Sequence, residues 1–137
     1  MKIGQNSDQT LALLQKVLDL RADNEKVIAS NIANSETPGY RPSRLNFEKQ
    51  LQHAMDKSSF SGQTTHKSHI PLGPNNLEQV KGIVSKEQNT VELGDKNGVS
   101  LDEEMLSLAK NELLYETAAQ LLKKKLSIQK YVISGGQ

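Results

Sequence analysis

The segment ASNIANSETPGY, residues 29–40, describes the end of a helix and the way in which the chain leaves it. Thr37 stands before Pro38, and a residue in that position is pushed out of helical geometry. Proline suits the second position of a type II turn and glycine suits the third, so Pro38-Gly39 favours such a turn. The segment therefore predicts a helix that stops here and a tight turn that delivers Tyr40 back toward it.

Two asparagines precede this turn. Asn31 and Asn34 are three residues apart and share one face of a helix, as do the small residues Ser30 and Ala33. Asparagine side chains bond backbone groups beside them, which helps to stop a helix. Small residues on this face would let another backbone approach closely.

Upstream of the turn, residues 8–34 contain neither glycine nor proline, so this stretch is free to form a long helix. Asn6 and Ser7 are candidate N-caps. Its length of about 27 residues would span roughly 40 Å. Apolar residues follow a three-four spacing that is broken by polar residues at 21–25. The two rows are Leu11, Leu14, Leu18, Ile28 and Ile32, and Leu13, Val17, Leu20 and Val27.

A second stretch without glycine or proline covers residues 100–133. Ser100 and Glu103 fit a capping box, and the acidic start and basic end suit the helix dipole. Two apolar rows again follow a three-four spacing. They are Leu101, Met105, Leu108, Tyr115, Ala119, Leu122, Leu126 and Ile133, and Leu106, Ala109, Leu113, Thr117, Leu121 and Ile128. We expect the two long helices to pack seam to seam, antiparallel or staggered.

The middle of the chain, roughly residues 41–98, is polar and holds all but one of the prolines. Leu45–Met55 has the pattern of a short amphipathic helix, whereas 79–84 and 90–93 have weak strand character. Residues 56–68 are rich in serine and threonine and are expected to be mobile. Such an insert is either disordered or an interaction loop.

These patterns predict a mainly α fold in which two long terminal amphipathic helices form an elongated, coiled-coil-like hairpin. We divide the chain into a first helix with its exit turn (1–40), a variable insert with short strands (41–98) and a second helix (99–137). Only 4% of the residues are aromatic and none is tryptophan, which is little for a self-contained core. The apolar rows are either an intramolecular seam alone or, as we favour, a seam that also engages neighbouring chains.

Composition argues against several functions. The 17 basic and 16 acidic residues nearly balance, so no general attraction to nucleic acid or lipid is expected. The chain has no cysteine, no apolar run of about 20 residues, no secretory signal and no catalytic motif. His66 and His69 are best explained as solvated loop residues, and Lys123–Lys125 as a solvated helix face. We therefore expect no enzyme, no metal, no cofactor and no membrane span.

The pattern N-x-A-N-x-x-T-P-G-Y, which ends at Tyr40, resembles the N-terminal signature of the bacterial flagellar rod and hook protein family. Arg21 resembles a basic position seen in many members. The entry to the last helix, residues 97–105, and the N-x-L-x-Y pattern at 111–115 resemble those of the short basal-body rod proteins. Among these, the B-type proximal rod proteins are the most similar, and the C-type proteins are the nearest alternative.

This resemblance implies a structural subunit of the proximal rod that polymerises by helix packing into a hollow shaft joining the membrane ring to the distal axle. It implies a helical hetero-oligomer with other rod proteins, contacts with the rod–ring adaptor protein and the export gate, and a periplasmic location reached without a cleaved signal peptide. A cytoplasmic coiled-coil adaptor or export chaperone is the competing class, but it would not require the exit turn.

On this basis we select two sets of site residues. The candidate assembly residues lie on both helices, and they are Leu14, Leu18, Arg21, Ile28, Asn31, Ile32, Asn34, Leu108, Tyr115, Leu122 and Leu126. The exit-turn residues are Thr37, Pro38, Gly39 and Tyr40. Helices that are loose in the monomer would become ordered as they bury these residues against neighbouring subunits.

Overall fold

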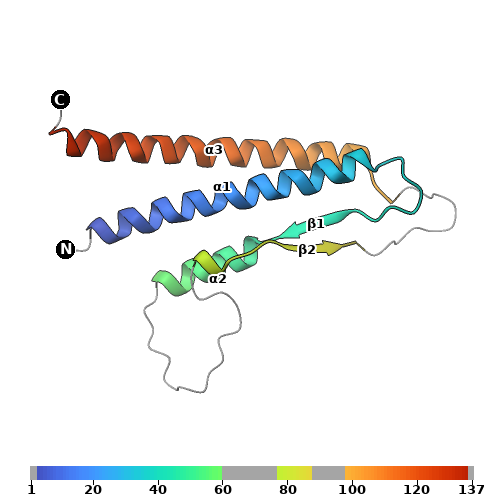
Figure 1. Ribbon diagram of the computed structural model, residues 1–137, viewed down its shortest axis with the longest axis horizontal. Helices are drawn as coiled ribbons and strands as arrows, with labels where there is room; N and C mark the ends of the chain where they lie inside the picture. Colours follow the sequence, from blue (N-terminus) through green and yellow to red (C-terminus); the bar gives the residue numbers. More distant parts are fainter. Residues whose placement is uncertain (1–2, 60–76, 88–97, 136–137) are drawn as a thin grey trace, which may run out of the picture.

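A computed structural model describes residues 3–59, 77–87 and 98–135 of the chain (Figure 1). In chain order, its elements are α1 (Ile3–Ala33), β1 (Ser43–Asn46), α2 (Glu48–Ser59), a 3₁₀ turn η1 (Leu77–Gln79), β2 (Ile83–Lys86) and α3 (Leu101–Ile133). The predicted strand at 90–93 and the two histidines at 66 and 69 lie outside the described residues.

Helices α1 and α3 form a long antiparallel hairpin, with both chain ends at the same end of the molecule (Figure 1). The prediction of a mainly α fold with two long terminal helices is therefore confirmed. The predicted N-cap of α1 is wrong, because the helix already begins at Ile3 and runs through Asn6 and Ser7. A capping side chain contributes only about 1 kcal/mol, so such a residue does not stop a helix that can extend by another turn.

The start of α3 agrees with the predicted cap. The Ser100 hydroxyl accepts a hydrogen bond from the Glu103 backbone N–H at 3.5 Å. Asp102, Glu103 and Glu104 lie in the first turn and Lys130 in the last, where their charges complement the helix dipole.

The insert is more regular than its composition suggested. β1 and β2 form an antiparallel ribbon in which Ser43 lies opposite Lys86 and Asn46 opposite Ile83. The predicted helix over 45–55 begins too early, since α2 starts at Glu48 and reaches Ser59, inside the segment expected to be mobile. The strand predicted over 79–84 is also displaced: η1 ends at Gln79 and β2 starts only at Ile83.

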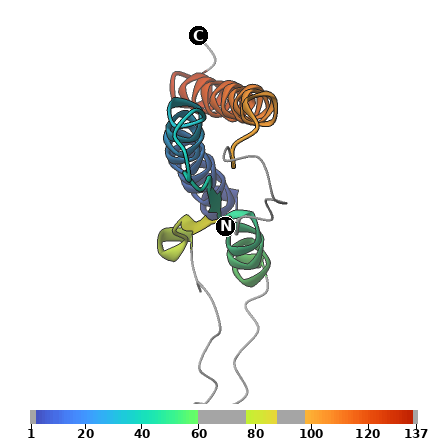
Figure 2. The same cartoon turned by 90° about the vertical axis from the view of Figure 1, so that its right-hand side faces the viewer.

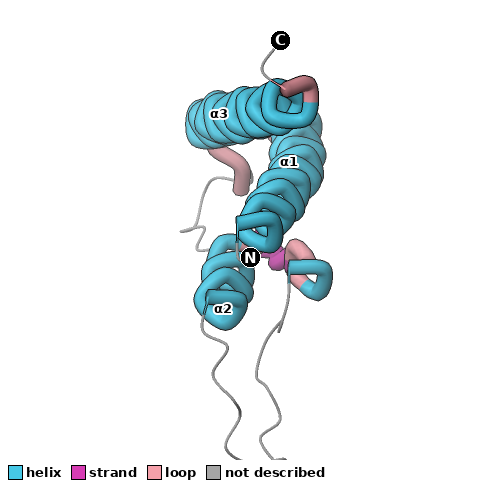
Figure 3. The backbone as a smooth tube through the Cα atoms, turned by 90° about the vertical axis from the view of Figure 1, so that its left-hand side faces the viewer, coloured by secondary structure: helices cyan, strands magenta, loops and turns pink. Residues whose placement is uncertain are grey.

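The apolar core lies between α1 and the insert rather than between the two long helices. Buried Leu20 of α1 packs with Phe47, Ala54 and Val80. Leu45, Leu51 and Leu77 surround this cluster. Seen end-on, α1 lies between α3 on one side and α2 with the ribbon on the other (Figures 2 and 3). α1 is therefore the central element of the fold.

The exit turn has the predicted geometry. The Tyr40 backbone N–H donates to the Thr37 carbonyl at 3.1 Å, and Gly39 has φ of +75°. A bonded four-residue turn with proline second and a positive φ at the third position is a type II turn. It returns the Tyr40 hydroxyl to α1, where it lies 3.1 Å from Asn31 Oδ1.

We predict that Gly39→Val lowers the free energy of unfolding of the isolated chain by about 1–2 kcal/mol, because a branched side chain clashes at positive φ. Gly39→Asn is the matched control, since asparagine tolerates this conformation and should cost less. Urea unfolding followed by far-ultraviolet circular dichroism measures both. Equal losses for the two variants would contradict the role assigned to this φ angle.

Candidate functional site: a polar junction and the outer face of α3

The side chain of Asn31 joins three parts of the chain at the end of α1. It is fully buried, with no exposed surface. Its Nδ2 donates to the Ser43 carbonyl at 2.8 Å and to Glu104 Oε2 at 3.1 Å. Its Oδ1 accepts from the Ser43 backbone N–H at 2.9 Å and from the Tyr40 hydroxyl at 3.1 Å. All four hydrogen-bonding positions of the amide are used, which offsets the cost of burying it.

Glu104 continues this junction into the insert. Its side chain is 1% exposed, and Oε1 pairs with Arg44 Nη1 at 2.5 Å. The Arg44 Nε in turn donates to Glu87 Oε1 at 2.9 Å. One guanidinium on β1 therefore connects the first turn of α3 with the residue that follows β2.

Burial lowers the pKa of Arg44, but bonding and attraction to Glu87 and Glu104 outweigh that effect. The pKa of Arg44 consequently lies above its ordinary value, and the guanidinium stays charged. Because the Glu104 carboxylate is buried, its stability in the fold depends on this cation and on the Asn31 amide.

A second polar contact crosses the hairpin midway along α1. Asn111 of α3 is buried, accepts from Asn24 Nδ2 at 2.9 Å and donates to the Arg21 carbonyl at 2.9 Å. The Arg21 guanidinium lies 4.9 Å from the centre of the Phe47 ring and pairs with Glu48 at 3.2 Å. The polar interruption at 21–25 in the sequence of α1 is thus a contact between α1, α3 and the insert.

The predicted assembly residues of α1 lie mainly inside the chain. Ile28 and Asn31 are buried, and the other five are partly buried: Leu14, Leu18, Arg21, Ile32 and Asn34. Asn34 also shapes the exit, because its Nδ2 donates to the Ser30 carbonyl at 2.8 Å. In the exit turn only Tyr40 is partly buried, whereas Thr37, Pro38 and Gly39 are exposed.

The seam predicted for α3 is wrong in its composition. The buried residues of this helix are Glu104, Asn111 and Ala118, which belong to neither apolar row. Leu108 and Leu122 are partly buried beside them, whereas Tyr115 and Leu126 are exposed. Every residue of the second row is exposed. We call its large apolar members Leu106, Leu113, Leu121 and Ile128 the outer stripe. Polar pairing, and not apolar area alone, therefore selects the face of α3 that meets α1.

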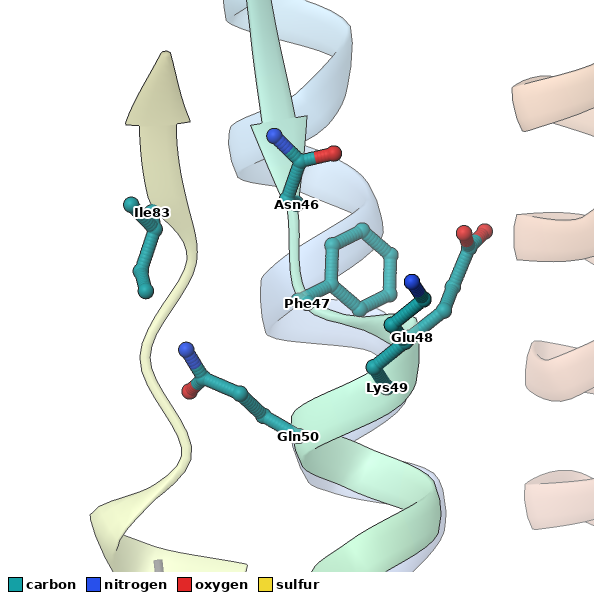
Figure 4. Close-up of a pocket in the computed structure, with 6 residues that line it drawn as sticks. All are labelled: Asn46, Phe47, Glu48, Lys49, Gln50 and Ile83. Carbon is teal, nitrogen blue, oxygen red and sulfur yellow. The ribbon is translucent and has the colours of Figure 1, made fainter. Parts of the chain in front are cut away.

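One surface recess is formed where β1 meets α2, beside β2. The recess drawn in Figure 4 has a volume of about 350 Å³ and is lined by Asn46, Phe47, Glu48, Lys49, Gln50 and Ile83. Its charged groups are one carboxylate and one ammonium. Within the described residues there is no cluster of three or more potential metal ligands, and no helix long and apolar enough to cross a membrane.

Sequence reasoning did not single out Asn24, Arg44, Glu104 or Asn111 as site residues. For the two that lie in α3, the spacing was a usable signal. Glu104, Asn111 and the buried Ala118 repeat every seven residues, so they share one face of this helix. Apolar periodicity could not reveal this face, because two of its three buried members are polar.

Comparison with known proteins places this architecture in context. A family model described as "Flagella basal body rod protein" matches residues 18–41, which run from the Arg21 contact through the exit turn. The chain is 32% identical to the flagellar basal body rod protein FlgB of Escherichia coli (strain K12), covering 94% of this chain and 96% of that protein. It is 31% identical to FlgB of Yersinia enterocolitica, with 84% and 86% covered. It is 28% identical to FlgB of Bacillus subtilis (strain 168), with 93% and 95% covered.

We predict that Arg44→Met lowers the free energy of unfolding by about 3 kcal/mol, because it leaves the Glu104 carboxylate buried without its cation. Adding Glu104→Gln should restore at least about 1 kcal/mol, since a neutral amide needs no cation and can still accept from Asn31. Urea unfolding of the single and double variants measures the coupling.

Arg41→Met is the matched control for Arg44→Met. Arg41 is exposed and forms no ion pair among the described residues. Its loss should change the free energy of unfolding by no more than about 0.5 kcal/mol. If Arg41→Met and Arg44→Met were equally destabilising, the junction would not have the role assigned to it.

Proposed function

Because this chain belongs to the flagellar basal-body rod protein family and is a structural subunit of the rod, we propose that it polymerises through the outer face of α3. Together with other rod proteins it would form a hollow helical shaft that joins the membrane ring to the distal axle. The observation that carries this proposal is the distribution of apolar side chains that the single chain leaves in water.

These side chains are concentrated on α3. Leu106 is 72% exposed and Leu113 is 65% exposed. Large apolar side chains are also exposed at Leu101, Met105, Leu114, Tyr115, Leu121, Leu126, Ile128, Tyr131, Val132 and Ile133. Exposed apolar side chains in such number on one helix favour a contact with another protein. The proposal thus rests on a helix that uses one face inside the chain and leaves the others to neighbours.

α1 differs from α3 in this respect. No large apolar residue of α1 between residues 8 and 33 is highly exposed, because α3 covers one side and the insert the other. We propose that Leu14, Leu18, Ile28 and Ile32 serve assembly by holding α3 in place. Tyr115 and Leu126, which are exposed, would contact neighbouring subunits directly.

The contact is proposed to be heterologous, with the outer stripe of one subunit against a different surface of the next. Such contacts do not close on themselves and generate a helix. We further propose that the partners include the rod–ring adaptor protein and the export gate, and that the chain reaches the periplasm without a cleaved signal peptide. A structural role of this kind requires no catalysis, metal or cofactor.

The relatives reported above are all FlgB proteins, which favours the B-type over the C-type assignment. A cytoplasmic adaptor or export chaperone does not agree with membership of a rod protein family. It also gives no reason for an exit turn held by an amide in which every hydrogen-bonding position is used.

The test uses a strain that lacks this gene. Electron microscopy of its membranes should show rings without a rod, and the wild-type gene should restore rods and swimming. The double variant Leu113→Gln/Leu121→Gln should reduce the number of assembled rods at least tenfold. Each buried leucine contributes about 1.5–3 kcal/mol, so two are worth about 3 kcal/mol or more at every contact.

Glu112→Gln is the matched control, because it alters an exposed polar residue of the same helix and should leave swimming normal. Circular dichroism of the purified double variant should match the wild type, since both substituted leucines are more than half exposed. Complete rods in the deletion strain, or normal rods with the double variant, would refute the proposal.

A further inference from the structure

The β1–β2 ribbon has two edges, and they differ in what covers them. In an antiparallel pair, opposing residues alternate between exchanging two hydrogen bonds and directing both backbone groups away from each other. The Glu87 N–H donates to the Pro42 carbonyl at 3.0 Å, which makes these two a bonded pair. The next pair, Ser43 and Lys86, must therefore direct its backbone groups outward.

On the β1 side, Asn31 pairs with the outward groups of Ser43. Its amide donates to the Ser43 carbonyl and accepts from the Ser43 N–H, as the backbone of a neighbouring strand would. This edge also faces α1, so no further strand can add there (Figure 1). The junction at the end of α1 thus closes one edge of the ribbon.

On the β2 side, the outward groups belong to Val84 and Lys86. The pair of Val84 and Leu45 is two positions along the ribbon from the pair of Lys86 and Ser43, so its backbone groups also point outward. No described residue pairs with the backbone of either one. β2 lies on the side of the ribbon away from α1 (Figure 1), and all four of its residues are exposed.

The side chains along this edge indicate what could bind. Ile83 and Val84 are each 56% exposed, which is unusual for an uncovered edge strand because it invites pairing. Lys81 and Lys86 flank them, and neither forms an ion pair with a described carboxylate. Val84 and Lys86 direct their side chains to one face of the ribbon and Ile83 to the other, so the edge presents both apolar and cationic groups. Such an edge complements an extended segment that carries apolar and acidic residues.

We propose that the open edge of β2 binds an extended, acidic segment of a neighbouring rod subunit by strand addition. The backbone groups of Val84 and Lys86 supply the hydrogen bonds, and Lys81 and Lys86 pair with the acidic residues of the segment. The identity of the partner as a rod subunit rests on the proposed function, but the contact is separate from the outer stripe of α3.

Lys86→Pro tests the backbone contact. Proline removes an N–H that faces away from β1, and its φ is compatible with an edge strand, so the ribbon should persist. In the deletion strain this variant should reduce assembled rods and swimming at least tenfold. Lys86→Ala removes the side chain beyond Cβ, with its ammonium group, but keeps the backbone N–H, and should have a smaller effect, about two- to threefold. Normal rods with Lys86→Pro would overturn the proposal.

A second measurement holds even if Lys86→Pro perturbs the fold. Val84 is replaced by the photoreactive p-benzoylphenylalanine, and purified basal bodies are irradiated and mapped by mass spectrometry. A crosslink to an acidic segment of an adjacent rod subunit is expected. A crosslink to a helix, to another copy's β2 or to a ring protein, or none at all, would refute the proposal. The outer-stripe variants would still fail to assemble, which separates this outcome from failure of the proposed function.

Discussion

The amide of Asn31 is the group on which the arrangement of the other elements depends. It is buried where α1 ends, and a buried amide is tolerated only if its donors and acceptor are satisfied. Ser43, Tyr40 and Glu104 satisfy it together. Each of these partners comes from a different part of the chain: the start of β1, the exit turn and the first turn of α3. Satisfying one side chain therefore fixes where three segments meet.

From this point the molecule is organised around α1. One side of that helix contacts the insert through an apolar core, and the other meets α3 through a seam with buried Glu104, Asn111 and Ala118. Polar groups in a helical seam specify register, because any slip would leave them buried without partners. They also contribute little apolar burial. Many large apolar side chains of α3 consequently stay exposed in the single chain.

The exit turn and polar contacts of the ribbon likewise fix the position of the insert. The turn directs the chain so that β1 runs back along α1, and Arg44 then ties β1 to both Glu104 and Glu87. The segment matched by the rod family model, residues 18–41, contains Arg21, Asn24, Asn31 and the turn. Its family signature therefore corresponds to a physical unit: the part of α1 that holds α3 and the ribbon in register.

The sequence by itself determined the two long helices, the Ser100 cap, the type II turn and the family. These features depend on local backbone preferences, on the absence of glycine and proline, and on a motif of adjacent residues. Only the tertiary structure decided which face of α3 turns inward, that Ser43–Asn46 is a strand, and that Arg44 and Glu104 pair. Those outcomes depend on partners far apart in the chain: Asn31 lies 73 residues from Glu104, and Arg44 lies 43 residues from Glu87. Apolar periodicity contains no information about such pairs, because a buried polar residue looks like a solvated one until its partner is known.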